Sequence, residues 1–454
     1  MTPNRSLAIS LQLKELMRTD FLQNIDESFP YGLIANYQST ESTKIKRDRM
    51  YNEENTLLTM LATAIQEDKS LKQSVNIFKE VFELKGKEIK KKEAVQLQLE
   101  QAEESRSIAA GELRKRGRRR LYTSRLPKSK ELAVSDNTAA YAKARARLEN
   151  TLVNKVFEYS ADFKELNGKK WHGMNTFITD GTYFQMQDTE ELRKKYYVKE
   201  GDNAYPQGLL QAVLWQGSGQ VYSFKIGTRH QSELELVRSL IESLPEGSLL
   251  LADDLYSTYT VFCLMQKKGC HLIVPGKRER NYTVIKKLSK GDEIVELRKP
   301  KNKPDWLGKE EWKQLPAKIT MRRVTFPSTS DEQQECVQYT TLINEEISNT
   351  EIILKYSTRW DIEITIREIK TLMGINIARS KTENMVDKEI TIALTAYNMI
   401  RKIISKSVAK TDFSPQGNFI QECFEIDKKL FVDKKGRVHH HWSSGRYGQA
   451  NATN

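Results

Sequence analysis

The segment YSTRWDIEITIREIKTLMGI (356–375) carries the acid Glu363 among basic and aromatic side chains. An α-helix turns about 100° per residue, so a helix here gathers several polar residues within an arc of about 80°. These polar residues are Tyr356, Arg359, Glu363, Arg367 and Lys370. The adjacent arc is apolar and is expected to face a core through Ile362, Ile366, Ile369 and Met373. The pattern predicts a polar stripe beside a buried face, and a ladder of i,i+4 ion pairs is the plainer alternative.

The charge of the chain favours a polyanionic partner. The 454 residues include 73 Lys and Arg against 60 Asp and Glu, which gives a net charge of +13. Nucleic acid is the expected partner, unless the charge serves only solubility. Four cysteines without a CxxC pair argue against a zinc knuckle or a disulfide scaffold. No apolar run approaches about 18 residues, so we expect an intracellular protein that does not span a membrane.

The N-terminal region, residues 1–165, is expected to be mainly helical. Apolar residues recur at helical spacing in 55–66, 70–86 and 136–163. Residues 111–131 instead contain nine Lys and Arg and two Glu, including Arg118, Arg119 and Arg120. Because such a stretch cannot bury a core, we predict that it contacts DNA, with a solvated linker as the alternative.

After residue 170 the pattern changes to strands that alternate with helices. A hairpin is predicted at 208–228, further strands at 174–186, 247–254, 270–276 and 337–343, and helices at 232–244 and 256–269. This order predicts an α/β fold, a mixed sheet flanked by helices. Residues 278–336 interrupt the alternation with strand patterns at 291–300 and 317–326. The interruption is too long for an ordinary loop and predicts a β-rich insertion.

Three groups of acids stand out by position. Asp180 is expected at the end of the first strand, Asp253 and Asp254 at the end of a central strand, and Glu363 on the late helix. Acids at the ends of neighbouring strands can converge with one from a packed helix, and such a cluster binds cations. Two Mg²⁺ ions held in this way support in-line phosphoryl transfer. Each acid alone is weak evidence, because Asp-Gly is first of all a turn dipeptide.

The combined motifs resemble a known family. Tyr356-x2-Arg359-x3-Glu363-x6-Lys370 is similar to the Tyr-Arg-Glu-Lys signature of bacterial insertion-sequence family four transposases, which are DDE enzymes with an RNase H-like core. ITDGTYFQMQDT (178–189) and LLLADDLYSTY (249–259) resemble the two Asp segments of that family, and residues 299–324 resemble its β-rich insertion. The likeness extends over roughly residues 136–404.

The resemblance implies a cut-and-paste DNA transposase. It implies that Asp180, Asp253 and Glu363 bind two Mg²⁺ ions, with Mn²⁺ as a substitute. Asp254 stands where the family often has Arg, and it stays open as the alternative ligand to Asp253. The implied partners are double-stranded DNA, as terminal inverted repeats and target, and a second copy of the chain in a homodimer. A hairpin intermediate and a location in the bacterial cytoplasm, at the nucleoid, are implied as well.

The implied DNA contacts come from the signature and from the insertion. Tyr356, Arg359, Arg367 and Lys370 are expected to hold the backbone near the cut. An aromatic residue of the insertion is expected to stack on a base flipped out at the hairpin, since stacking stabilises an extruded base. Trp306 is favoured over Trp312, and packing of both in the insertion's own core is the alternative.

The expected organisation has three parts. Residues 1–165 form a helical DNA-binding region, 166–406 an RNase H-like catalytic domain, and 407–454 a tail for dimerisation or DNA contact. Two other functions remain as alternatives. A stand-alone RNase H-like nuclease would cleave DNA without strand transfer, and a non-catalytic DNA-binding protein would have no use for three converging acids.

Overall fold

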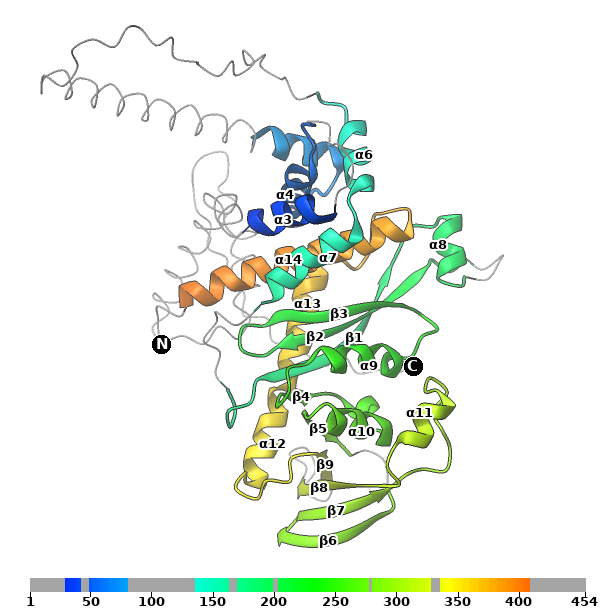
Figure 1. Cartoon of the computed structure of the whole chain (residues 1–454), viewed down its shortest axis with the longest axis vertical. Helices are drawn as coiled ribbons and strands as arrows, with labels where there is room; N and C mark the ends of the chain where they lie inside the picture. Colours follow the sequence, from blue (N-terminus) through cyan, green and yellow to red (C-terminus); the bar gives the residue numbers. More distant parts are fainter. Residues whose placement is uncertain are drawn as a thin grey trace, which may run out of the picture.

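The computed structural model describes residues 29–41, 49–80, 135–162, 170–198, 203–276, 280–327 and 335–408. The predicted basic stretch 111–131, with Arg118, Arg119 and Arg120, lies outside these ranges, as does the tail from residue 409 onward. Within them, one long mixed sheet runs through the molecule and helices pack on both of its faces (Figure 1).

The sheet has nine strands in the order β3-β2-β1-β4-β5-β9-β8-β7-β6. The strands are β1 (Thr176–Gln185), β2 (Gln207–Trp215), β3 (Gln220–Thr228), β4 (Leu249–Leu251), β5 (His271–Pro275), β6 (Tyr282–Ser289), β7 (Asp292–Arg298), β8 (Lys318–Pro327) and β9 (Glu335–Thr340). The predicted hairpin at 208–228 is the antiparallel pair β2–β3. Strands β1, β4 and β5 are parallel to one another, and every other neighbouring pair is antiparallel.

Alternation along the central strands creates two cores. Successive strand side chains point to opposite faces, so Ile178 of β1 joins one core and Phe177 joins the other. Helices α7 (Asn150–Ala161), α13 (Asp361–Leu372) and α14 (Glu383–Val408) cover the Ile178 face. Helices α9 (Glu233–Ser243) and α10 (Tyr259–Lys267) cover the Phe177 face. This mixed sheet with flanking helices is the RNase H-like α/β core that the sequence predicts.

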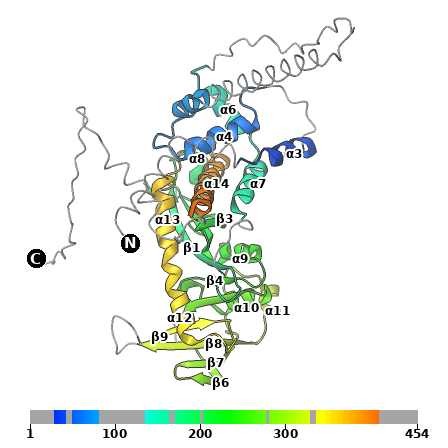
Figure 2. The same ribbon diagram turned by 90° about the vertical axis from the view of Figure 1, so that its left-hand side faces the viewer.

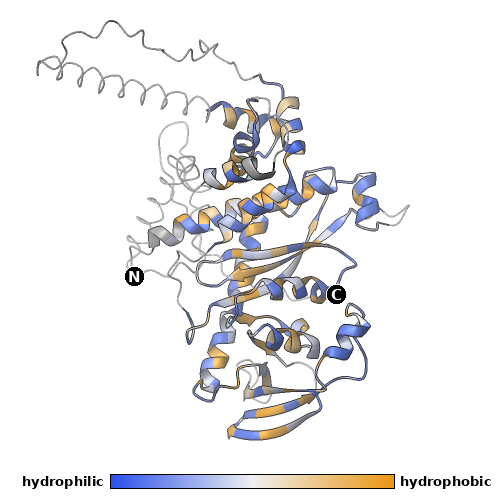
Figure 3. Cartoon of the chain, viewed as in Figure 1, coloured by the Kyte–Doolittle hydropathy of each residue, from blue (hydrophilic) through white to orange (hydrophobic). Residues whose placement is uncertain are grey.

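The remaining helices are short. They are α3 (Tyr31–Glu41), α4 (Glu53–Ala64), α6 (Ala139–Arg147), α8 (Glu190–Lys195), α11 (Lys309–Gln314), α12 (Asn349–Ser357) and the 3-10 turns η1 (Asp254–Tyr256) and η2 (Thr358–Trp360), and residues 71–80 are helical as well. The helix expected at 136–163 is divided into α6 and α7 at the buried Leu148. α4 packs against α14, and α8 and α11 are largely hydrophilic (Figure 3). No helix in the described ranges is long and apolar enough to cross a bilayer.

The region between β5 and β9 continues the main sheet. The strands expected at 291–300 and 317–326 are β7 and β8, and β6, which the sequence reading missed, is the exposed last strand. β9 pairs with β5 on one side and with β8 on the other. The β-rich segment is therefore an antiparallel extension of the central sheet, joined through β9.

The segment 356–375 is not one continuous α-helix. α12 ends at Ser357, η2 follows, and α13 begins at Asp361, so that α12 and α13 follow one another along the same side of the sheet (Figure 2). The hydroxyls of Ser357 and Thr358 donate to the backbone carbonyls of Leu354 and Lys355 at 2.7 and 2.6 Å. Such local bonds compete with the regular helical ladder and tighten the turn. The predicted polar stripe therefore comes from three elements, with Tyr356 on α12, Arg359 on η2, and Glu363, Arg367 and Lys370 on α13.

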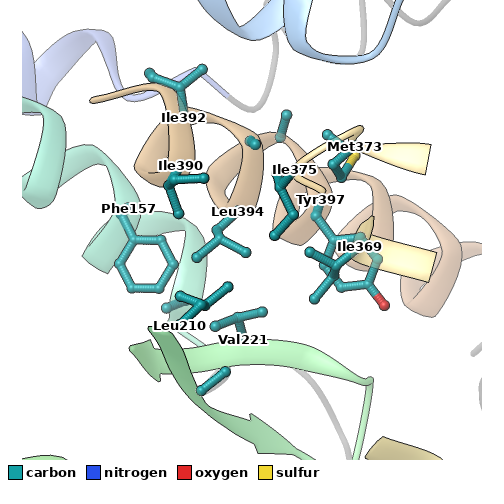
Figure 4. Packing of buried hydrophobic residues seen from close by; sticks show 14 of the residues in the cluster. Phe157, Leu210, Val221, Ile369, Met373, Ile375, Ile390, Ile392, Leu394 and Tyr397 are labelled. Atoms are coloured by element: carbon teal, nitrogen blue, oxygen red, sulfur yellow. The ribbon is translucent and has the colours of Figure 1, made fainter. Parts of the chain in front are cut away.

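The predicted apolar face of this segment is confirmed. Ile362, Ile369 and Met373 are buried, and Ile366 packs partly buried against the same core. Figure 4 shows Ile369 and Met373 beside Leu394 and Tyr397 of α14, above the strands that carry Leu210 and Val221. α13 thus packs on the sheet beside α14.

A buried ion pair ties α13 to α14. The Arg401 guanidinium donates to a carboxylate oxygen of Glu368 at 2.8 Å, and both side chains are almost fully buried. The Tyr397 hydroxyl donates to the same oxygen at 3.2 Å. Burial raises the pKa of Glu368, while the charge of Arg401 opposes that rise. The pair therefore depends on both members.

We predict that Arg401→Met destabilises the protein by about 3–5 kcal/mol, because it leaves the Glu368 carboxylate buried without its partner. The double variant Glu368→Leu/Arg401→Met should regain most of that loss, since neither charge then remains inside. Urea unfolding followed by circular dichroism measures both. Wild-type stability in Arg401→Met, or no recovery in the double variant, would contradict the role assigned to the pair.

Candidate active site

Asp180 lies within β1, and the prediction that it ends the strand was wrong. β1 runs from Thr176 to Gln185, because its antiparallel partner β2 continues beside it and pairs Ala212 with Asp180. On its other edge, the parallel partner β4 is short and its last pair is Ile178 with Leu251. Asp180 therefore lies two residues beyond the point where this neighbour ends.

Asp253, which the sequence places at the end of a strand, lies at the same offset beyond the end of β4. It follows Leu251 by two residues, as Asp180 follows Ile178. Side chains two residues apart share a face of a sheet, so the parallel register places the two acids side by side beyond the same pair. Asp253 also caps η1, because its Oδ1 accepts the backbone N–H of Leu255 at 2.9 Å. Asp254 is the first residue of that turn, and the register favours Asp253 as the partner of Asp180.

Glu363 reaches the site from the first turn of α13, which packs on β1. The Arg359 guanidinium donates to its Oε1 at 3.2 Å. The Arg359 side chain is 11% exposed and the Glu363 side chain 38%, so the cation is the more deeply held member of the pair. Its guanidinium carbon also lies 5.0 Å from the centroid of the exposed Trp360 ring. η2 thus places a largely buried cation beside the acids.

The three acids lie in one electrostatic field. Burial raises the pKa of Asp180, and the negative charges of Asp253 and Glu363 raise it further. The Gly181 N–H, at 2.8 Å, and the Arg359 charge act in the opposite direction. Burial likewise raises the pKa of Asp253, again opposed by Arg359. Carboxylates that repel one another in this way are stabilised by a cation.

The donor chemistry fits a hard divalent cation. Mg²⁺ and similar ions take carboxylate oxygens, and three carboxylates share this field. No three carboxylate, imidazole or thiol groups of the described residues are close enough together to hold a metal ion. Among the three acids, Glu363 is the one whose hydrogen-bond partner is a charged side chain, that of Arg359.

The other signature residues differ in burial and in their contacts near the acids. The Tyr356 hydroxyl donates to the carbonyl of Ala252 at 3.2 Å, which joins α12 to the chain just before Asp253. Burial raises the pKa of Tyr356 to about 12, so its proton is retained. Along α13, Lys370 is half-buried and Arg367 is exposed.

The two predicted stacking residues differ in their surroundings. The ring of Trp312, on α11, lies 4.7 Å from the Lys299 ammonium, which also donates to the Trp312 carbonyl. Trp306 lies half-buried in the loop that precedes α11. Trp312 is thus engaged by its own segment.

The sequence reading missed a fourth acid. Glu233, in the first turn of α9, is half-buried, and the charges of Asp180 and Asp253 add to the effect of burial in raising its pKa. It accepts a hydrogen bond from the Tyr256 hydroxyl at 3.0 Å. No local sequence pattern marks Glu233. The one detectable signal was Tyr256, three residues after Asp253, whose hydroxyl donates to Glu233.

Comparison with known proteins shows what the chain is similar to. The family model described as "Transposase DDE domain" matches residues 171–399. The chain is 29% identical over 306 residues to "Transposase InsG for insertion sequence element IS4" of Escherichia coli (strain K12), covering 65% of this chain and 67% of that protein. Among solved structures, a piggyBac transposase synaptic complex with hairpin DNA overlaps with a TM-score of 0.35 and 8% identity, over 94% of this chain and 82% of that one.

We predict that Asp253→Asn weakens Mn²⁺ binding by at least about tenfold, whereas Asp254→Asn leaves it near wild type. Asn keeps the cap on the Leu255 N–H, so the variant isolates the loss of charge at Asp253. Calorimetric titration of each variant with Mn²⁺ gives the affinities. The reverse order would make Asp254 the ligand.

Proposed function

Since the chain belongs to the family of DDE transposases, and within it to insertion-sequence family four, we propose that Asp180, Asp253 and Glu363 are the acids with which it cleaves and joins DNA. Members of this family are enzymes that cut DNA and transfer its strands. The observation that carries the proposal is the register of β1 and β4, which sets Asp180 and Asp253 side by side under the helix that carries Glu363.

The proposed cofactor is Mg²⁺, bound as two ions, with Mn²⁺ as a substitute. When bound, such ions activate the attacking oxygen and stabilise the leaving one in an in-line displacement at phosphorus. Asp180 and Asp253 would be held rigidly for this task, by the sheet and by the η1 cap respectively. Glu363 would join them when a cation replaces Arg359 as its partner.

Arg359 is suited to such an exchange. Its Nε is buried and has no hydrogen-bond partner among the described residues, although its terminal nitrogen bonds Glu363. A guanidinium that turns from a carboxylate to a phosphate keeps its charge paired, and a phosphate can accept two hydrogen bonds from it in a bidentate manner. We therefore assign Arg359 to the DNA backbone in the loaded site, together with Tyr356, Lys370 and Arg367.

The proposed DNA partners are the terminal inverted repeats of the element and a target duplex. The helical residues before 166 and the basic stretch 111–131 would bind the repeat, and two copies of the chain would bridge two ends as a homodimer. The relative InsG belongs by name to an insertion sequence element, which supports transposon ends as the substrate. Residues 166–406 would form the catalytic domain.

We predict that Glu363→Gln lowers Mg²⁺-dependent nicking at the element's end by about a hundredfold or more, because it removes a ligand charge but keeps the shape of the side chain. Binding of the same end should survive, as judged by gel shift. Glu346→Gln, in an exposed loop, is the matched control for loss of one carboxylate. Near-normal nicking by Glu363→Gln would refute the assignment. Nicking without strand joining by the wild type would identify a nuclease.

Cleavage through a hairpin on the transposon end is part of the proposal. Closing a hairpin bends DNA sharply and drives a base out of the stack, and an aromatic side chain that receives the base stabilises it by about 1–3 kcal/mol. Trp306 is the better candidate for this role, because the Trp312 ring already lies against Lys299.

We predict that Trp306→Ala leaves the first nick intact but slows hairpin closure, so that nicked ends accumulate on a denaturing gel. Trp312→Ala is the matched control, since it removes an equal ring from the same segment. Normal closure in both variants, or double-strand breaks without hairpins in the wild type, would exclude this mechanism.

A further inference from the structure

Two acceptor oxygens lie close to Gly181, with no hydrogen-bond donor placed between them in the described residues. A Cβ atom added to Gly181 would lie 2.7 Å from Oε2 of Glu233 and 2.9 Å from Oε1 of Gln211. Both oxygens therefore approach the bare backbone that follows Asp180. Only glycine leaves this space open, and its lack of a side chain lets both oxygens approach the backbone of β1.

The Gln211 amide has only one consistent orientation. Its Nε2 donates to the Thr179 hydroxyl at 2.9 Å and to the Tyr256 hydroxyl at 2.7 Å. The Thr179 hydroxyl donates to the Ala212 carbonyl, and the Tyr256 hydroxyl donates to Glu233. Each hydroxyl oxygen is therefore available as an acceptor for the Gln211 amide. A flipped amide would set oxygen against oxygen twice. The Gln211 carbonyl oxygen must therefore face Gly181 and Glu233.

That carbonyl oxygen is buried and has no hydrogen-bond partner within the part of the chain that the structure describes. Gln211 is 0% exposed, so water does not reach it from the surface as a ready replacement. An unpaired buried acceptor costs free energy, and proteins retain such groups where a ligand satisfies them. The neighbouring side chain here is the Glu233 carboxylate, which is also an acceptor. The group that would satisfy the Gln211 oxygen is therefore one that attracts both oxygens.

We propose that Glu233 and the Gln211 carbonyl extend the metal-binding group of the active site, as a fourth carboxylate and a neutral oxygen beside Asp180. A divalent cation is attracted by both oxygens at once and by the acids around them. Tyr256 is a positioning residue, because its hydroxyl links Gln211 to Glu233 and holds the carboxylate against Gly181. The inference rests on the proposed function, since it adds ligands to the cation of that site.

The arrangement also explains why a fourth acid is kept in a site that already repels acids. Glu233 begins α9, where a helix N-terminus favours negative charge by a modest amount. Its neighbour Glu235, on the same turn, is exposed and satisfies the same preference without entering the site. The helix end therefore accounts for an acid in this turn, but not for one turned inward onto Asp180 and Asp253.

Titration of the full chain with Mn²⁺ alone, by calorimetry, tests the proposal. Glu233→Gln should weaken Mn²⁺ binding by about tenfold, and Tyr256→Phe by a smaller factor, because the carboxylate stays but loses its holder. Glu235→Gln, which removes the same charge from the same helical turn, should bind as the wild type does.

Thermal unfolding supplies a second readout that separates a ligand from a structural residue. Without metal, Glu233→Gln should unfold at the wild-type temperature or above it, because it removes repulsion among buried acids. The rise in unfolding temperature that Mn²⁺ produces in the wild type should shrink in this variant, since that rise follows the affinity.

Two results would overturn the inference in distinguishable ways. If Asp253→Asn loses Mn²⁺ but Glu233→Gln and Tyr256→Phe keep it, Glu233 is a neutral structural acid that donates to Gln211, and the proposed function stands. If neither Asp253→Asn nor Asp254→Asn loses Mn²⁺ binding, the proposed function fails and this extension fails with it.

Discussion

The position of the candidate site depends on three paired residues of two parallel strands. β4 is only three residues long, and it pairs with Thr176, Phe177 and Ile178 of β1. This pairing sets the positions of the residues that follow on both strands, Asp180 and Asp253 among them. Parallel strands are buried on both faces, and all three leucines of β4 are fully buried. A shift of one residue would turn Asp253 to the opposite face, so apolar burial of the leucines holds the polar geometry in place.

The third acid depends on a different kind of constraint. The hydroxyl bonds of Ser357 and Thr358 interrupt the helix just before Glu363, and the resulting turn presents Arg359 to it. The far end of α13 is fixed by the buried pair of Glu368 with Arg401. The sheet and the η1 cap thus fix Asp180 and Asp253, while Glu363 stands next to a helix interruption.

These features differ in how far the sequence could predict them. The apolar runs that became β4 and β5, and the hairpin of β2 and β3, follow from local periodicity, and so does the buried face of α13. The continuation of β1 through Asp180-Gly181 does not, because a turn dipeptide is overridden by pairing with residues that lie thirty positions away. Glu233 was missed for a similar reason. Its role comes from Tyr256 and Gln211, and no spacing within α9 contains that information.

The balance of forces at the acids indicates why an arginine stands among them. Burial raises the pKa of Asp180, Asp253 and Glu233. The charge of Asp253 adds to this rise at Asp180 and Glu233, and the charge of Asp254 adds to it at Asp253. The bond of Arg359 to Glu363 is an i,i+4 pair on a partly exposed carboxylate, and such pairs contribute only about 0.3–0.5 kcal/mol. A contact this weak does not hold the site together by itself, but its charge lowers the repulsion among the acids when no other cation is present. Arg359 therefore acts as a counter-ion that keeps the acids compatible with the fold, more through its charge than through this one contact.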